Sequence, residues 1–382
     1  MRVVVIGAGI VGSCLAYRLA ERGAEVVLVD AGHPAGGLSA HSFAWLNAVA
    51  SAGPQYFALT LEGLAAHRRL AADLGEPGWL VPTGNLQWAS APSDRDAMLD
   101  RADLLRQSGY PVREYVPERA CAELEPDVRL ERACGPVLYY SADAYLRPTP
   151  LIVGLLARAG SLGLVARFGT TVADILVCGS RVDGVVSGAG ERLAADVVVC
   201  CAGRGTADLV GRVGARVPLL DPADPGSATV GLLVRTTPVP VRLRRVLHAP
   251  GLSVRPDEAG RLLLHCHDVD RLVRAGGTGP VAPAAAAAAA EFVLDRLGPV
   301  VRGAAGARVE QAYVGVRPMP ADGLSVVGWV PGVESLYVVV THSGMTLAPV
   351  LAEVASREVT GVPQDVPLAF RPDRFLPAAS AT

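Results

Sequence analysis

The clearest structural signal in the chain is Val3-Val4-Val5-Ile6-Gly7-Ala8-Gly9-Ile10-Val11-Gly12. Four β-branched residues predict a short buried strand, and the glycine-rich turn leads into an amphipathic helix that runs to about Arg22. A second predicted strand, from Glu25 to Val29, ends in Asp30. This is the position of the acidic ribose ligand in a dinucleotide-binding βαβ unit, so we predict such a unit here.

The three glycines of this turn have distinct physical roles. Gly7 permits a tight turn, Gly9 lets a pyrophosphate approach the backbone, and Gly12 lets the helix pack on the strand. The helix N-terminus then directs unpaired N–H groups and a positive dipole end at the phosphates. Nicotinamide and flavin dinucleotides both use such a pocket, so the unit alone does not distinguish them.

The same residues have a competing interpretation as a secretory leader. Arg2, the apolar run from Val3 to Ala16 and Cys14 resemble a signal peptide with a lipoprotein cleavage box. Cleavage after Ser13 would destroy the βαβ unit, which explains more residues. The seven cysteines are odd in number and lack C-x-x-C spacing, so we expect no disulfide framework or zinc site and a cytoplasmic location.

Composition excludes several classes of protein. A chain of 382 residues is long enough for more than one domain, and 51% hydrophobic residues exclude disorder. With 35 basic and 37 acidic residues, the chain lacks the excess of positive charge that binds nucleic acid or an anionic membrane, so we expect neither partner. All basic residues are arginine, which excludes Schiff-base, Walker and kinase lysines.

Further along the chain, helices and strands alternate in segments. We predict helices over 59–73 and 93–108, a helix beginning near Pro148 and ending at Gly160, and a hairpin over 170–186 that leads to a buried parallel strand, Asp196 to Gly203. Alternating residues over 225–275 predict antiparallel sheet, and the alanine tract 283–290 continues into a helix. Strands over 324–329 and 336–340 precede a final helix that ends near Gly361.

These landmarks together resemble the D-amino-acid oxidase, glycine oxidase and sarcosine dehydrogenase superfamily of FAD-dependent flavoproteins. The resemblance rests on the βαβ unit, on Ala144-Tyr145-Leu146-Arg147-Pro148, on the Asp196–Gly203 strand, and on the series Arg317-Pro318, Asp322-Gly323 and His342-Ser343-Gly344. It implies an α/β fold: an FAD-binding, Rossmann-like domain of the glutathione-reductase type (1–80, 141–212 and 313–382) with an inserted α+β substrate domain built on an antiparallel sheet (81–140 and 213–312).

The resemblance also implies a set of FAD-binding residues. The start of the last helix should lie near the flavin pyrimidine ring, where its N–H groups favour the negative charge of the reduced flavin. The complete set is Gly7, Gly9, Ile10, Val11, Gly12, Asp30, Ala31, Ser39, His41, Ser42, Val172, Ala202, Gly203, Gly344, Met345 and Thr346.

Arg317 is the leading candidate for substrate binding. In amino-acid oxidases of this kind, an arginine in the matching Arg-Pro setting binds the substrate carboxylate, and a guanidinium does so with two parallel hydrogen bonds. The alternative is an ordinary surface ion pair. His342 follows a predicted strand near the expected flavin edge, where it is a candidate catalytic residue or a backbone cap.

Two further histidines are candidates for the substrate pocket. His248 and His265 lie on predicted strands, and His267 is expected on the same strand face as His265, followed by Asp268 and Asp270. Two ligands on one strand do not make a metal site, so we predict no metal.

The implied reaction is oxidation of an amine or amino acid at its C–N bond. Hydride transfer to flavin N5 yields an imine, which water hydrolyses. The alternatives are FAD-dependent oxidation of a 2-hydroxy acid or alcohol, with His342 or His265 as the base, or a flavin-binding subunit without turnover of its own. Oligomeric state stays open.

His41 raises one more possibility. It lies eleven residues after Asp30, and its place resembles that of the histidine bonded covalently to FAD in sarcosine and dimethylglycine dehydrogenases. Ala40 stands where those relatives have Trp, and Ser42 and Phe43 differ from the small pair usual there. The alternative is that His41 only hydrogen-bonds FAD.

Overall fold

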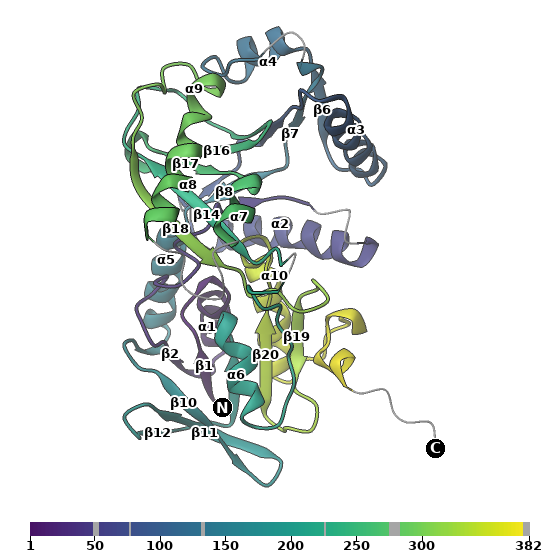
Figure 1. The fold of residues 1–382 in the computed structure, drawn as a ribbon. Helices are drawn as coiled ribbons and strands as arrows, with labels where there is room; N and C mark the ends of the chain where they lie inside the picture. The colour runs from purple at the N-terminus through teal and green to yellow at the C-terminus, as the bar shows by residue number, and fades with distance from the viewer. Residues whose placement is uncertain (49–52, 76–77, 131–133, 225–226, 275–282, 377–382) are drawn as a thin grey trace.

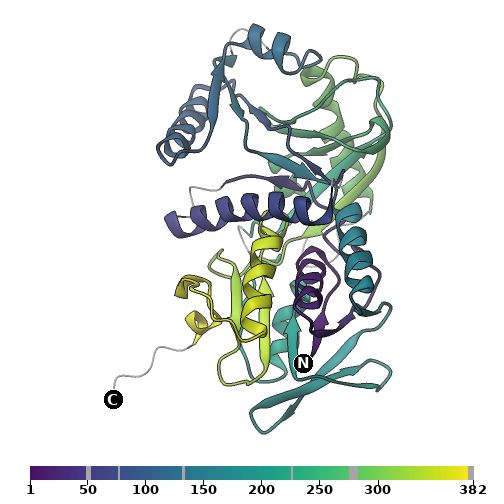
Figure 2. The ribbon, with the colours of Figure 1, turned by 180° about the vertical axis from the view of Figure 1, so that it is seen from behind.

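Two large β-sheets organise the chain, one at each end of the molecule (Figures 1 and 2). The computed structural model describes residues 1–382 except 49–52, 76–77, 131–133, 225–226, 275–282 and 377–382. The first sheet has six strands, most of them parallel, and the second has eight, most of them antiparallel. The chain crosses between them several times, so each sheet contains strands that are far apart in the sequence.

The six-stranded sheet has the order β19-β20-β13-β1-β2-β9. Its strands in chain order are β1 (Arg2–Ile6), β2 (Glu25–Val29), β9 (Val165–Arg167), β13 (Val197–Cys200), β19 (Val326–Trp329) and β20 (Leu336–Val340). All neighbouring strands are parallel except β19, which runs antiparallel to β20. Because β1 is covered on both faces, its run of valines is fully buried.

Each face of this sheet has a different cover. Val3 and Val5 of β1 pack in one apolar core with the helices α1 (Ile10–Glu21), α5 (Pro148–Ser161) and α10 (Gly344–Val359). Val4 and Ile6 face a second core, shared with the antiparallel strands β10 (Val172–Cys178), β11 (Arg181–Ser187) and β12 (Arg192–Ala194) and with α6 (Thr206–Gly211). The alternation along β1 therefore separates two covering layers.

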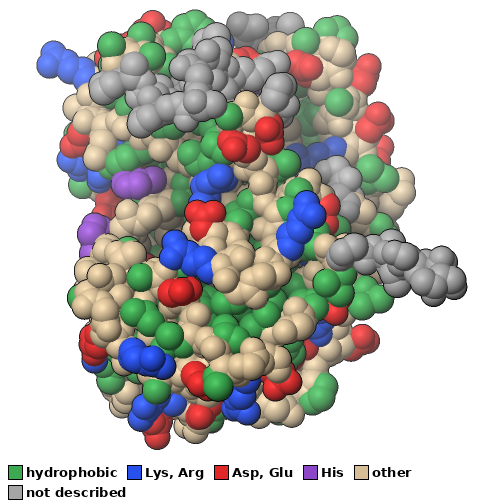
Figure 3. Space-filling view, turned by 60° about the horizontal axis from the view of Figure 1, so that its bottom comes forward, with side chains coloured by type: hydrophobic (Ala, Val, Ile, Leu, Met, Phe, Trp, Pro, Cys, Tyr) green, Lys and Arg blue, Asp and Glu red, His purple; other side chains and the backbone are tan. Residues whose placement is uncertain are grey.

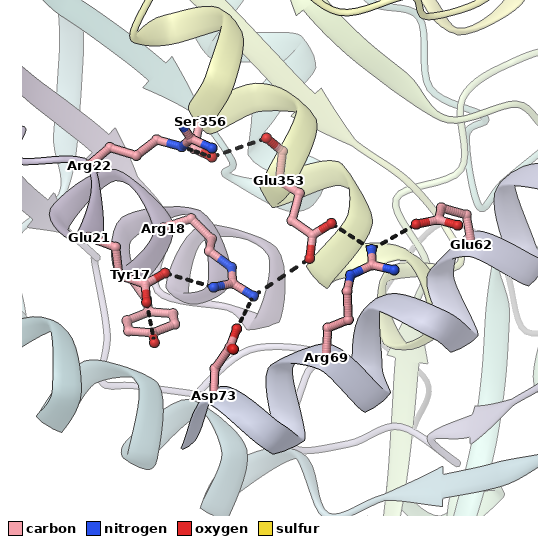
Figure 4. A network of polar contacts seen from close by, with 9 residues as sticks. All are labelled: Tyr17, Arg18, Glu21, Arg22, Glu62, Arg69, Asp73, Glu353 and Ser356. Atoms are coloured by element: carbon pink, nitrogen blue, oxygen red, sulfur yellow. Dashed lines mark hydrogen bonds and ion pairs between the residues drawn. The ribbon is translucent and has the colours of Figure 1, made fainter. Parts of the chain in front are cut away.

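The long helix α2 (Pro54–Leu74) packs across α10. A glycine in α2 makes this close approach possible, because a Cβ atom on Gly63 would lie 2.6 Å from the carbonyl oxygen of Thr346. Charged side chains join the same helices: Arg18 of α1 contacts Asp73 of α2 and Glu353 of α10, and Arg69 of α2 also contacts Glu353 (Figure 4).

The eight-stranded sheet has the order β18-β14-β17-β16-β15-β5-β7-β6. Its neighbours are antiparallel except β15 and β5. The strands are β5 (Asn85–Gln87), β6 (Val112–Tyr115), β7 (Val137–Tyr140), β14 (Val230–Thr236), β15 (Val246–Ala249), β16 (Leu252–Pro256), β17 (Leu262–His265) and β18 (Val309–Val316).

Helices and a small sheet complete the structure. Helices α7 (His267–Arg274), α8 (Pro283–Asp295) and α9 (Leu297–Val300) lie near the eight-stranded sheet, and buried side chains of α8 and α9 join its core. Helices α3 (Pro92–Gln107) and α4 (Pro117–Glu123) lie beside β6 and β7 (Figure 1). The small sheet consists of β3 (Trp45–Leu46), β8 (Ala144–Leu146) and β4 (Leu80–Val81).

Most predicted elements form close to their expected positions, with two differences. Helix α2 begins at Pro54 rather than near residue 59, because a proline at the first helical position needs no N–H partner. The predicted antiparallel sheet over 225–275 ends at His265, and a helix follows. Acidic residues in the first turn of α7, Asp268 and Asp270, favour this helix.

Two surface properties bear on partners. Acidic and basic side chains are interspersed over the face seen in Figure 3, without a large area of one sign. Among the described residues, no helix combines the length and the apolar character that crossing a membrane requires.

Candidate active site

A cavity of about 740 Å³ is lined by residues of both large sheets. Its wall contains most of the residues predicted from the sequence: Gly7, Gly9, Ile10, Val11, Ser39, His41, Ser42, Ala202, Gly203, His248, His265, Arg317, His342, Gly344, Met345 and Thr346. Gly12, Asp30, Ala31 and Val172 lie outside this wall. The structure thus brings residues from seven separate chain segments together around one space.

The glycine turn between β1 and α1 is shaped by close backbone contacts. Gly7 has φ +104°, and a Cβ atom there would lie 2.5 Å from the carbonyl oxygen of Cys201. A Cβ atom on Gly12 would lie 1.8 Å from the carbonyl oxygen of Gly7, so Gly12 is required by packing. A Cβ atom on Gly9 would meet only the Ser39 hydroxyl, at 3.2 Å, which leaves Gly9 facing open space on the cavity side.

Asp30 and Ser39 hold this turn from the neighbouring loop. The Asp30 carboxylate accepts hydrogen bonds from the N–H groups of Ala8 and Gly32, each at 2.7 Å. The Ser39 hydroxyl accepts one from the N–H of Ile10 at 3.0 Å. A carboxylate has about four acceptor positions, so Asp30 retains capacity for a ribose hydroxyl. Asp30 therefore also has a structural function that the sequence did not reveal.

On the opposite side, the N-terminus of α10 reaches the cavity. Ser343, Gly344, Met345 and Thr346 line it, and the helix begins without a side-chain hydrogen bond at its N-cap. The Cβ position of Gly344 lies 3.6 Å from the side chains of Ile10 and Val11, so the two helix N-termini meet at this point. Two positive helix ends facing one cavity favour a bound anion.

Arg317 follows β18 on the cavity wall. Its Nη1 donates to the carbonyl of Ala228 at 2.8 Å, and its backbone N–H donates to Thr229 at 2.8 Å. Nη2 lies 3.0 Å from the Cβ position of Gly231, so a larger residue in β14 would displace the guanidinium. The absence of a side chain at Gly231 therefore leaves room for Arg317.

His265 and Asp270 form a buried pair beside Arg317. The Nε2 of His265 lies 2.9 Å from Oδ2 of Asp270, and Oδ1 of Asp270 accepts the N–H of Leu232 at 2.8 Å. Burial tends to raise the pKa of Asp270, but the hydrogen bond from His265, the Leu232 N–H and the charge of Arg317 together lower it. Asp270 was not among the predicted site residues, because its contact with His265 depends on how α7 folds back.

The expectation that His265 and His267 share a strand face is wrong. His265 ends β17, whereas His267 begins α7. Their rings still meet, with centroids 4.5 Å apart, and ligand atoms of both lie within 4.8 Å of Asp270 and of each other. Asp270 is already hydrogen-bonded and lies in the field of Arg317, which opposes a cation. We therefore treat this cluster as hydrogen-bonded groups.

His248 and His342 are partly buried and neutral. The Nδ1 of His248 lies 2.8 Å from the Ser253 hydroxyl, and its ring packs on Trp45 at 4.2 Å. Burial lowers the pKa of His248 to about 3. Burial, followed by the charge of Arg317, lowers the pKa of His342 to about 4. The His342 ring lies parallel to Tyr56, and its buried Nδ1 has no hydrogen-bond partner among the residues that the structure describes.

His41 is stacked on Tyr313 of β18, with ring centroids 4.1 Å apart. Within the described part of the chain its buried Nδ1 has no hydrogen-bond partner, and burial lowers the pKa of the ring. An unpaired buried nitrogen is costly unless a ligand satisfies it. The glycine turn, two helix N-termini and these unpaired nitrogens of His41 and His342 fit a large anionic cofactor with ring heteroatoms.

Comparisons with known proteins agree with this geometry. Residues 2–358 match the family described as "FAD dependent oxidoreductase". The chain is 27% identical over 374 residues to the glycine oxidase of Geobacillus kaustophilus, covering 94% of this chain and 93% of that protein. It is 28% identical over 424 residues to the D-amino acid dehydrogenase of Cereibacter sphaeroides, covering 94% and 92%.

A solved structure shows the same fold. The crystal structure of glycine oxidase from Geobacillus kaustophilus superimposes with a TM-score of 0.83 and 24% identity, covering 98% of this chain and all of that one. The chain therefore belongs to the FAD dependent oxidoreductase family. The predicted fold class, enzyme class and cofactor are confirmed.

Proposed function

We propose that this protein catalyses the FAD-dependent oxidation of an amine or amino acid to an imine. The observation that carries the proposal is the position of Arg317 in the same cavity as the glycine turn and the N-terminus of α10. An arginine here provides a carboxylate site next to the cofactor site. The glycine oxidase and D-amino acid dehydrogenase relatives support an amino-acid substrate.

In this proposal the chain's own groups have distinct tasks. Arg317 binds the substrate carboxylate, and Gly231 leaves the space for its guanidinium. Neutral His248 and the Phe43 and Trp45 rings shape the rest of the pocket and exclude water. His342 also lines the cavity, two residues before the start of α10. When bound, FAD would supply the oxidant that takes two electrons, as a hydride, from the substrate's Cα–H bond.

For the cofactor, we propose binding by the glycine turn with Ile10 and Val11, by Ser39, His41 and Ser42, by Ala202 and Gly203, and by residues 344–346. Asp30 and Ala31 would bind the ribose side and Val172 the adenine, although these three lie outside the cavity wall. A covalent bond between FAD and His41 is supported by the buried Nδ1 of His41, which lacks a hydrogen-bond partner among the described residues, and the alternative is noncovalent contact alone.

We also propose two domains, with FAD bound by 1–80, 141–212 and 313–382 and substrate by 81–140 and 213–312. The two substrate segments supply most of the eight-stranded sheet. Segment 81–140 contains β5, β6 and β7, and segment 213–312 contains β14 to β17. β18 extends from Val309 to Val316 across one proposed boundary. A cytoplasmic location is supported by seven free cysteines.

A second candidate function is the oxidation of a 2-hydroxy acid. It is favoured by the hydrogen-bonded pair of His265 and Asp270, because removing an alcohol proton needs a positioned base. The same cavity would bind the acid through Arg317.

Anaerobic mixing of the FAD-loaded protein with amino acids, secondary amines and 2-hydroxy acids tests these functions. We expect amino acids to reduce the flavin and so bleach its absorbance after mixing. Bleaching by 2-hydroxy acids alone would establish the second candidate. A flavin that no substrate class reduces would contradict both and leave a flavin-binding subunit.

A further inference from the structure

His265 differs from the other histidines of the cavity in its hydrogen bond to Asp270. Among the described histidines of its wall, His265 is the one with a carboxylate within hydrogen-bond distance, at 2.9 Å. Both side chains are buried, with His265 6% and Asp270 1% exposed. Burial of a carboxylate is costly unless it is paired, so Asp270 fixes the orientation of the imidazole that faces it.

The hydrogen bond determines which nitrogen of His265 can react. Because Asp270 is an acceptor through Oδ2, Nε2 of His265 carries the proton, and Nδ1 carries the lone pair. Oδ1 of Asp270 is held by the Leu232 N–H, so the carboxylate cannot rotate away without losing that bond. A histidine oriented by a buried carboxylate is the arrangement of a general base, in which the carboxylate stabilises the imidazolium.

The titratable and charged groups that face His265 come from three places in the fold. His248 lies on β15, His267 and Asp270 belong to α7, and Arg317 follows β18. The paired strand positions beside it, Leu233 of β14 and Ser253 of β16, are uncharged. Burial lowers the pKa of His248 to about 3, which makes His248 a poor base. The charged group hydrogen-bonded to His265 is the carboxylate of Asp270, at 2.9 Å.

We propose that His265, oriented by Asp270, accepts the proton that the substrate's α-ammonium group loses before oxidation. This inference rests on the proposed amine oxidation. The substrate N–H bond breaks as an Nδ1–H bond forms on His265, which leaves a neutral amine and an imidazolium paired with Asp270. No electron moves in this step, and the carboxylate of the same substrate stays on Arg317.

The test follows flavin reduction by an amino acid in anaerobic stopped flow, as a function of pH, in the FAD-loaded enzyme. In the wild type, proton transfer to His265 should allow reduction at pH values at which the free substrate is still an ammonium ion. His265→Asn should lower the rate at pH 7 by about 10²-fold, the usual size of a general-base contribution. It should also move the pH midpoint upward by about one unit or more, because only substrate already present as the free amine then reacts.

Asp270→Asn tests the role of the carboxylate that orients His265. The amide keeps the volume and can still accept the Leu232 N–H, but it no longer stabilises the imidazolium. Proton transfer to His265 then costs more free energy, so the limiting rate should fall about tenfold or more. His267→Asn is the matched comparison. It removes an imidazole that is 81% exposed on the same wall, but it leaves the hydrogen bond between His265 and Asp270. The pH midpoint of flavin reduction should therefore stay in place.

Benzoate binding supplies a readout that does not depend on turnover. Benzoate has a carboxylate and no ammonium group, so its perturbation of the oxidised flavin spectrum should persist in His265→Asn and weaken in Arg317→Ala. Loss of benzoate binding in both variants would show that His265 only maintains the pocket and would overturn the proposal. So would a wild-type rate and midpoint in His265→Asn. If wild-type flavin is not reduced by any amine, the proposed function fails, and this inference fails with it.

Discussion

His67 of α2 lies 2.7 Å, through its Nε2, from the carbonyl oxygen of Met345 in α10. In a regular helix this carbonyl would accept the N–H of residue 349, but residue 349 is proline and has none. His67 thus supplies the hydrogen bond that the helix lacks, at the turn that lines the cavity. Burial lowers the pKa of His67 to about 4, which keeps the ring neutral.

Replacing His67 should therefore weaken both the fold and cofactor binding. His67→Ala leaves a buried carbonyl without a donor, and we expect the free energy of unfolding to fall by about 1–3 kcal/mol. FAD affinity, measured by flavin fluorescence quenching, should fall as the first turn of α10 loosens. His67→Gln retains an N–H donor and should recover much of the loss. Equal behaviour of the two variants would contradict this account.

Acid should destabilise the protein through the same residue. The pKa of His67 is about 4 when folded and about 6.5 when unfolded, so the unfolded state binds more protons in between. Its contribution is present above pH 6.5 and is lost as the pH falls toward 4. Urea unfolding at several pH values measures how the free energy of unfolding depends on pH. In this window that dependence should be smaller in His67→Gln than in the wild type, by about 1.4 kcal/mol per pH unit. An unchanged slope would contradict a neutral, buried His67.

The two glycines of the turn should respond differently to substitution. Gly12→Val should prevent folding, because its Cβ would lie 1.8 Å from the Gly7 carbonyl. Gly9→Val meets only the Ser39 hydroxyl at 3.2 Å, so we expect a folded protein that no longer binds FAD. Circular dichroism and the flavin absorbance of purified protein separate the two results. A yellow Gly9→Val protein would place the pyrophosphate elsewhere.

Carboxylate recognition by Arg317 predicts a selective loss. Arg317→Lys and Arg317→Ala should lower kcat/KM for an amino acid by about 30- to 150-fold, which corresponds to about 2–3 kcal/mol from a charged hydrogen-bonded pair. For the amine that has the same side chain but lacks the carboxylate, kcat/KM should fall much less. Equal losses for the two substrates would show that Arg317 has only a structural function.

A covalent bond between FAD and His41 can be tested by acid precipitation. If the bond exists, yellow colour stays with the wild-type pellet, and His41→Ala releases it to the supernatant. His33→Ala is a suitable control, since His33 is exposed and lies in the same loop. If wild-type flavin leaves freely, His41 binds FAD through noncovalent contacts alone, and the assigned fold is unaffected.

The N-terminal half of the site was predictable because its signals are local. The glycine spacing, the strand of valines and Asp30 all act over a short stretch of chain, and each adopts the expected element. The contacts of His265 with Asp270 and of His67 with Met345 were not predictable. They depend on where α7 and α10 pack, and residues 67 and 345 are separated by 278 positions. His265-Cys266-His267 alternates like a strand, so the pattern alone concealed the start of α7.

The order of the six-stranded sheet has a consequence for synthesis of the protein. β1 emerges first from the ribosome, but one of its two neighbours, β13, begins only at Val197, and β20 follows at Leu336. The Cys201 carbonyl that packs against Gly7 of the glycine turn is therefore present only when about half of the chain has been made. Helix α10, which closes the cavity, comes later still. A nascent chain thus acquires its FAD site near the end of translation, and any product truncated before Gly344 should be colourless.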